Sequence, residues 1–143
     1  MSIARILALK GNEVFTTTPE QILKEVASEL ARRSIGALVV LDRWGEVAGV
    51  ISESDVVAAV AARGADAMSD SVASHMGRDF RFLTEEDSVD DAMETMTIER
   101  RRHLPVLRER RLVGLISIGD VVKYRIETIE AERKALHQYI ATA

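Results

Sequence analysis

Two short elements of this 143-residue chain combine a hydroxyl group, a carboxylate and the start of a helix. Ser52 and Asp55 stand three residues apart, and Ser117 and Asp120 repeat the spacing, each pair following a glycine and two apolar residues. A helix N-terminus presents free backbone N–H groups and favours phosphate, and a serine there adds a hydroxyl donor. A carboxylate one turn further on can accept both hydrogen bonds of a ribose diol. The two elements therefore predict nucleotide binding.

The same spacing also has a purely structural interpretation. A serine at a helix N-cap with an acidic residue three positions later forms a capping box, which needs no ligand. Two occurrences at equivalent places favour ligand binding in addition to capping, and the two roles are compatible. Gly49 and Gly114, which precede the elements, are expected to let a ligand or a neighbouring strand approach the backbone closely.

Positive charge gathers before the second element, although the chain has a net charge of −4. Residues 100–111 contain six arginines and His103, whereas the preceding predicted helix is acidic. Arg102 and His103 enter a strand that we expect to lie beside Ser117 and Asp120, where a guanidinium would hold phosphate through paired hydrogen bonds. We expect His103 to donate a hydrogen bond, because the histidines show no metal-ligand spacing. Lys123 is a further candidate phosphate partner.

An internal repeat contains both elements. An offset of 65 aligns residues 49–57 with residues 114–122, and six of the nine positions are identical. Further upstream the offset is 66. Continuous apolar strands need cover on both faces, which helices supply. The sequence therefore predicts an α/β (α+β) fold with two β-α-β-β-α repeats, residues 1–64 and 65–143, related by pseudo-two-fold symmetry and sharing one core.

The predicted elements follow from periodicity and from turn residues. The first repeat has strands over 14–17, 37–41 and 47–51, with helices over 19–33, starting around Pro19, and from Ser52 to Arg63. The second has strands over 80–83, 104–107 and 112–116, with helices over 85–99 and from Ser117 onward.

The last helix is predicted to extend to about Tyr139. Its apolar residues alternate in steps of four and three when Arg133 is included: Val122, Ile126, Ile129, Leu136 and Ile140. This spacing is typical of a coiled-coil seam. Two interpretations stay open, a stripe that packs on the chain's own body and a contact in a homodimer. We favour the second, because so long a helix extends beyond one small repeat.

These features resemble CBS domains, which are named for cystathionine β-synthase and occur as tandem pairs called Bateman modules. The resemblance rests on the β-α-β-β-α repeat and on the Gly-hydrophobic-x-Ser-x-x-Asp junction. It is stronger in the second copy, which has the sequence His103-Leu104-Pro105-Val106, than in the first, where Ala37-Leu38-Val39-Val40 lacks the proline. Both copies carry serine where the family more often has threonine.

The resemblance implies a stand-alone regulatory module that binds an adenosine-type nucleotide between its repeats. AMP is the first expectation, followed by ATP, ADP and NAD(H), and some family members bind S-adenosylmethionine. Each repeat would hold one site, with Asp on the ribose and Ser near the phosphate. The expected nucleotide-binding residues are Thr17, Gly36, Ala37, Ser52, Asp55, Phe82, Arg102, His103, Leu104, Ser117, Asp120 and Lys123. The resemblance also implies a homodimer and an unidentified regulated protein.

Composition argues against several other classes of function. The chain has no cysteine, which removes disulfides and thiolate nucleophiles and fits a reducing, cytoplasmic setting. It has no nucleophile elbow, P-loop or His-Glu-x-x-His motif, so we expect no enzyme, no catalytic residue and no metal site. No segment approaches the roughly 20 apolar residues of a membrane helix.

Two alternatives to a nucleotide sensor stay open at this point. One is a structural dimerisation scaffold whose Ser-x-x-Asp elements are only helix caps. The less favoured one is a nucleic-acid binder that uses the arginines, against which the acidic net charge and the six scattered aromatic residues argue.

Overall fold

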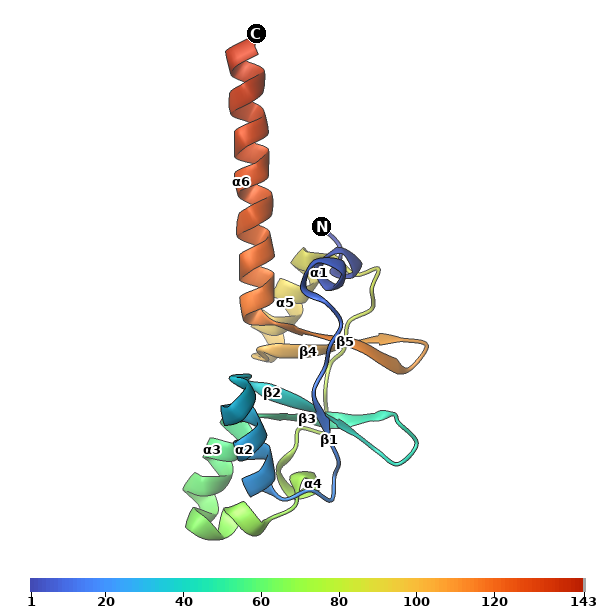
Figure 1. Cartoon of the computed structure of the whole chain (residues 1–143), viewed down its shortest axis with the longest axis vertical. Coiled ribbons are helices and arrows are strands. Elements are labelled where there is room, and N and C mark those ends of the chain that lie inside the picture. The colour runs from blue at the N-terminus through green and yellow to red at the C-terminus, as the bar shows by residue number, and fades with distance from the viewer. Residues whose placement is uncertain (143) are drawn as a thin grey trace.

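The molecule consists of two stacked halves, each a small sheet with helices, and one projecting helix (Figure 1). This computed structural model describes residues 1–142. The first half contains β1 (Thr16–Thr17), α2 (Leu23–Arg33), β2 (Ala37–Leu41), β3 (Val47–Ser52), α3 (Glu53–Arg63), a 3₁₀ helix (Gly64–Ser69) and α4 (Val72–His75). The second contains α1 (Ile3–Lys10), α5 (Val89–Glu99), β4 (His103–Arg108), β5 (Arg111–Ser117) and α6 (Ile118–Thr142). The predicted α+β class is confirmed.

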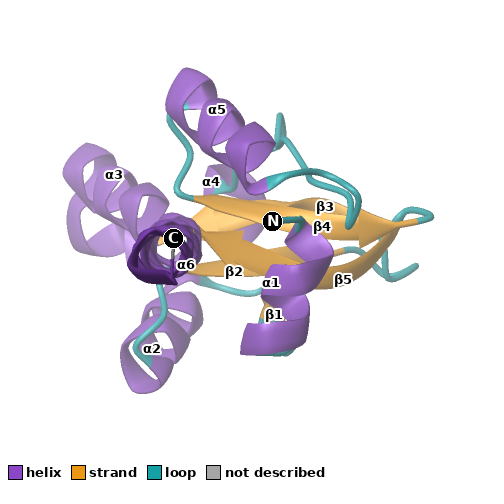
Figure 2. Ribbon diagram, turned by 90° about the horizontal axis from the view of Figure 1, so that it is seen from above, coloured by secondary structure: helices purple, strands orange, loops and turns teal. Residues whose placement is uncertain are grey.

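Strand pairing repeats between the halves. β2 runs antiparallel to β3, with Ala37 opposite Ser52, and β4 runs antiparallel to β5, with His103 opposite Ser117. The register therefore brings the first residue of one strand beside the serine that begins the following helix in both copies. In Figure 2, helices α3, α4 and α5 lie on one side of the sheets and α1 and α2 on the other. The predicted pseudo-symmetry and helical cover are present.

The start of α2 differs from the prediction. The helix begins at Leu23, not around Pro19, because the backbone before it pairs with the segment that follows α3. Ala73 donates to the Pro19 carbonyl at 2.9 Å, Val72 to the Gln21 carbonyl at 2.7 Å, and Leu23 to the Asp70 carbonyl at 3.0 Å. These long-range bonds replace the first turn that Pro19 could have started.

The first strand and first helix of the second repeat also differ from the prediction. Residues 80–83 form no strand, and a single bridge between Leu83 and Val106 marks the place. The helix expected from residue 85 begins at Val89, because Ser88 and Asp91 form a capping box there. The acidic segment before it is a turn.

Two hydrophobic cores, not one, hold the described residues together, so the prediction of a single shared core is wrong. Ile3 and Ile6 of α1 are fully buried in the core of the second half. Ala67 and Val72, which follow α3, are fully buried in the core of the first half. Core packing therefore crosses the predicted boundary at residue 64 in both directions.

Helix α6 leaves the body after its first two turns. Val121 and Tyr124 are buried, and the remainder projects away from both sheets (Figure 1). The seam residues Val122, Ile126, Ile129, Leu136 and Ile140 are 47–63% exposed. The stripe therefore does not pack on the chain's own body. No helix within residues 1–142 combines the length and the apolarity needed to cross a membrane.

Candidate functional site

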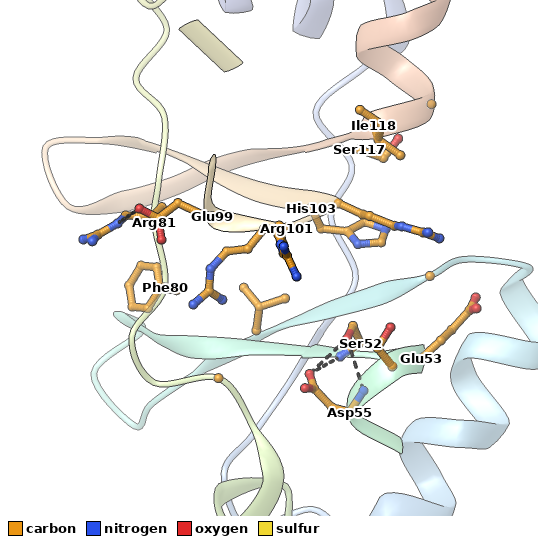
Figure 3. A pocket seen from close by; sticks show the side chains of 17 residues that line it. Ser52, Glu53, Asp55, Phe80, Arg81, Glu99, Arg101, His103, Ser117 and Ile118 are labelled. Carbon is orange, nitrogen blue, oxygen red and sulfur yellow. Dashed lines mark hydrogen bonds and ion pairs between the residues drawn. The ribbon is translucent and has the colours of Figure 1, made fainter. Parts of the chain in front are cut away.

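A cleft of about 520 Å³ lies between the two halves (Figure 3). Its walls are the start of α3, the segment from Glu99 to His103, the junction of β5 with α6, and the side chains of Phe80 and Arg81. The volume is in the range of small-molecule sites, roughly 300–1,000 Å³. Both halves contribute to this cleft, so a ligand in it would bridge them.

Ser52 and Asp55 form the capping box that begins α3. The Ser52 N–H and hydroxyl donate to Asp55 Oδ2 at 2.8 and 3.0 Å, and the Asp55 N–H donates to Ser52 Oγ at 3.4 Å. Ser117 and Asp120 repeat the arrangement, with bonds of 2.9 and 3.1 Å. The capping interpretation is therefore correct for both elements. It uses one carboxylate oxygen of Asp55 and leaves Oδ1 available to a ligand.

Arg102 and His103 lie beside Ser117, as predicted, because His103 is opposite Ser117 in the register and the Ile118 N–H donates to the Arg102 carbonyl at 2.8 Å. Arg100, Arg101 and Arg102 line the cleft together with Ser52 and Asp55, whereas Asp120 lines a separate pocket. Figure 3 shows Arg101 and His103 between the two sheets. The stacking of the halves brings the end of α5 to the start of α3, since Glu99 and Arg100 line the same cleft as Ser52.

Arg101 is the most constrained of these arginines. Its Nη2 donates to the Asp79 carbonyl, and its Nε is buried without a hydrogen-bond partner in the described structure. A buried donor without a partner costs about 1–3 kcal/mol. The buried Nε is closed to a ligand, but the hydrogen bond to the Asp79 carbonyl holds the rest of the Arg101 guanidinium at this wall of the cleft.

His103 separates the cleft from the second pocket and lines both. A Cβ added to Gly36 would lie 2.9 Å from His103 Nε2, so any larger residue there would displace the imidazole from its present position. Burial lowers the pKa of His103, and this effect outweighs the carboxylates of Glu53 and Asp120, which raise it. The imidazole is therefore neutral at pH 7 and offers hydrogen bonding without charge.

The second pocket, of about 300 Å³, surrounds Asp120. It takes Ser117 and Asp120 from the second repeat, but Phe15, Gly36 and Ala37 from the first. The cleft reverses this, because its serine and carboxylate come from the first repeat and its arginines from the second. Each pocket is therefore composite and lies between the repeats.

Lys10 enters the second pocket from the end of α1. Its Nζ lies 2.6 Å from Asp120 Oδ2 and donates to the Leu115 carbonyl at 2.8 Å. Burial raises the pKa of the Asp120 carboxyl, but the hydrogen bonds from Lys10 and from the Ser117 N–H outweigh it, so the pKa lies below its usual range. Sequence reasoning missed Lys10, because 110 residues separate it from Asp120.

Four predicted residues line neither pocket. Leu104 is fully buried in the core, Phe82 is 53% exposed, and Thr17 pairs with Val40 at the sheet edge. Lys123 lies over the Tyr124 ring at 5.2 Å. Sequence reasoning also missed several residues that do line the cleft: Glu53, Phe80, Arg81 and Arg101. Phe82 was expected in the site because residues 80–83 were predicted to form a strand. The segment is irregular, and it is Phe80 that lines the cleft.

Neighbouring protein groups, not a ligand, approach the two glycines before the elements. A Cβ at Gly114 would lie 2.6 Å from Leu7 Cδ2, and one at Gly49 would collide with the Gly77 carbonyl. The close approach predicted for a ligand or a strand is therefore made by a helix side chain at Gly114, and at Gly49 by the Gly77 backbone, which bridges to Val50. The physical role of this approach is packing.

A family model described as the CBS domain matches residues 10–62 and 71–127. The chain belongs to the CBS-domain family. The two matched segments correspond to the two halves of the fold, so the tandem pair implied by the resemblance is confirmed. CBS pairs are a regulatory, ligand-binding type of module.

Relatives share both the sequence pattern and the fold. The CBS-domain protein ATU1752 of Agrobacterium tumefaciens is 41% identical, with a TM-score of 0.84 over 87% of this chain and 92% of that one. The mitochondrial protein CBSX3 of Arabidopsis thaliana is 33% identical over 91% of this chain, which spans 65% of the relative. The CBS pair of protein MJ0100, in complex with 5′-methylthioadenosine and S-adenosyl-L-methionine, has a TM-score of 0.80 at 22% identity, covering 90% of this chain and 98% of that one. This last likeness concerns the fold alone.

Proposed function

We propose that this CBS pair binds an adenine nucleotide, AMP before ATP, ADP and NAD(H), in the cleft between its halves. The observation that carries the proposal is the arrangement of Asp55 and the arginines. The carboxylate stands at the start of α3 with Oδ1 outside the capping box, and Arg100, Arg101 and Arg102 line the same cleft. A ribose diol and a phosphate are the groups that suit these two walls.

Each wall would have a separate task in binding. Asp55 Oδ1 would accept from the ribose hydroxyls while Oδ2 keeps the capping box intact. The N-terminus of α3 and the guanidinium groups would attract the phosphate. The neutral imidazole of His103 would add a hydrogen bond without a charge. Adenosine compounds bound to the MJ0100 pair support this choice of ligand class.

A ligand in the cleft would act on the protein by joining its halves. The cleft contacts both the start of α3 and the β5–α6 junction, so occupancy would favour one packing of the halves over others. A change in packing at the β5–α6 junction would also move α6, which projects from the body. Through α6, a regulated protein, whose identity stays open, would respond to the nucleotide concentration. We propose binding without chemical conversion of the ligand, and a cytoplasmic location stays a prediction from the cysteine-free composition.

Isothermal titration with AMP, ATP and NADH tests the proposal, with Asp55→Ala as the main variant. We expect Asp55→Ala to weaken binding at least about 100-fold, because two hydrogen bonds to a charged acceptor contribute about 1.5–3 kcal/mol each. Asp91→Ala is the matched control, since Asp91 belongs to an equivalent capping box on α5 but lines neither pocket. It should lose helix stability in the same way and keep its affinity.

The two alternatives make different predictions in the same experiment. Absence of heat and of a thermal shift with all three nucleotides would favour a dimerisation scaffold. Salt-sensitive binding to nucleic acid that persists in Asp55→Ala would favour a role for the arginines there. Equal loss of affinity in Asp55→Ala and Asp91→Ala would show that capping, and not ligand contact, explains the effect.

We further propose that α6 pairs with a second copy as a parallel, in-register coiled coil. Arg125 and Glu130 flank the exposed seam on opposite sides and five residues apart, which is the spacing that meets across a parallel pair. Among residues 1–142 of one chain, the one carboxylate that Arg125 reaches is that of Asp90, at 3.9 Å. In an antiparallel pair centred on the seam, Glu130 of one copy would lie near Glu130 of the other, and the two carboxylates would repel each other.

Light scattering after gel filtration tests the pairing. Ile129→Glu places a charge on the seam and should give a monomer, whereas Ile98→Glu makes the same change at an exposed position of α5 and should stay dimeric. A monomeric wild type would refute the pairing. If Ile98→Glu gives a monomer while Ile129→Glu stays dimeric, the contact between copies lies on the body of the protein and not on α6.

A further inference from the structure

The two pockets differ in what already occupies their carboxylates. Asp120 has the Lys10 ammonium at 2.6 Å, with the two side chains only 20% and 26% exposed. Asp55 has no ion pair within residues 1–142. The internal repeat explains the difference, because the offset of 66 places Met76, which carries no charge, at the position that corresponds to Lys10.

Lys10 is held in this position by the packing of α1. Ile3 and Ile6 are fully buried in the second core, and the Ile3 N–H donates to the Asp87 carbonyl at 2.8 Å. Gly11 ends the helix directly after Lys10, with φ +93° and its N–H bonded to the Leu7 carbonyl. The ammonium group therefore approaches Asp120 from an anchored helix and not from a mobile tail.

The second pocket also lacks the arginine side chains that could bind phosphate in the cleft. Its only side chain with a permanent positive charge among the described residues is Lys10, and Glu13 adds a negative charge. The pocket measures about 300 Å³ against about 520 Å³ for the cleft. A nucleotide there would have to displace an ion pair and the hydrogen bond to Leu115 before its ribose could reach Asp120.

We infer that Lys10 substitutes for a ribose at Asp120 and restricts the chain to one nucleotide, held in the cleft at Asp55. The inference rests on the proposed nucleotide function and specifies which pocket is used. Lys10 therefore determines how many nucleotides the chain binds, and α1 blocks the second pocket by holding Lys10 against Asp120. Its removal should create a second site from residues already in place.

Titration calorimetry with AMP, and separately with ATP, measures the number of nucleotides per chain. The wild type should bind one and Lys10→Met should bind two, since methionine is the residue at the corresponding position of the other repeat. Arg5→Met is the matched control, because it removes one positive charge from the same helix outside both pockets, and it should still bind one. The double variant Lys10→Met/Asp55→Ala should bind one nucleotide, at Asp120.

The possible outcomes separate this inference from the function on which it rests. Two nucleotides on the wild type, or one on a folded Lys10→Met, would overturn the role of Lys10 and leave nucleotide binding standing. Binding of one nucleotide by Asp55→Ala with the affinity of the wild type, lost in Asp55→Ala/Asp120→Ala, would overturn it too. This comparison keeps the test valid should Lys10→Met fail to fold. No binding by either the wild type or Lys10→Met would overturn both proposals.

Discussion

The docking of α1 on the second half can be tested by removing one side chain. Ile6 is fully buried in the second core, and truncation to alanine leaves a cavity that the surrounding strands can fill only in part. Substitutions of this kind cost about 2–5 kcal/mol. Domains of this size are commonly stable by only about 5–15 kcal/mol, so the loss in Ile6→Ala is a large fraction of the whole.

Urea unfolding followed by circular dichroism measures this change. With a urea dependence of about 1–3 kcal/mol/M, a loss near 3 kcal/mol moves the unfolding midpoint by at least about 1 M. Leu9→Ala is the matched control on the same helix, because Leu9 is 49% exposed and alanine suits a helix as well as leucine. Its midpoint should stay where the wild type has it.

A midpoint in Ile6→Ala that matches that of Leu9→Ala would refute the reasoning. It would mean that α1 contributes nothing to the second core and that Lys10 is not anchored beside Asp120. A lower midpoint in Ile6→Ala than in Leu9→Ala would connect stability to binding. Undocking of α1 also removes the Lys10 ammonium from the second pocket. Loss of α1 packing should then raise the number of nucleotides bound.

Two further predictions concern charges in the pockets. The pKa of Asp120 is lowered in the folded protein, so the stability it contributes is present above the ordinary carboxyl pKa of about 4 and is lost as pH falls through the folded value. The advantage of the wild type over Lys10→Met in urea unfolding should therefore be constant near neutral pH and shrink below about pH 4; an unchanged gap at low pH would contradict this. Arg101→Met should weaken ATP binding at least about tenfold in calorimetry while adenosine binding changes little, because the guanidinium is expected to contact phosphate. An equal loss for both ligands would place Arg101 elsewhere.

Several features could be predicted from the sequence because short-range physics fixes them. Ser52 caps α3 and Gly64 ends it, as N-cap hydrogen bonding and the freedom of glycine require. The apolar runs became β2 and β3 with no more than one residue of error, since periodicity along the chain specifies a buried strand. The repeat itself was visible as a matching pattern, which needs no knowledge of packing.

Most of the failed predictions involve contacts between distant segments; the late start of α5 is the exception, because the local Ser88–Asp91 capping box sets it. Pro19 could have started a helix, but backbone pairing with residues 72–73 took its place, and no strand formed at residues 80–83. Arg102 and His103 do lie beside Ser117, but only the stacking of the halves shows that the arginines also line a cleft with Asp55.

The sequence by itself therefore determined which groups are candidates to bind a ligand: two capped helix starts, two carboxylates and a run of arginines. Only the tertiary structure decided how these groups combine, because each pocket draws its parts from both repeats. It also decided that the two carboxylates are unequal. Lys10 reaches Asp120 through the burial of α1 in a core that lies far along the chain, and the local residue pattern does not encode this long-range contact.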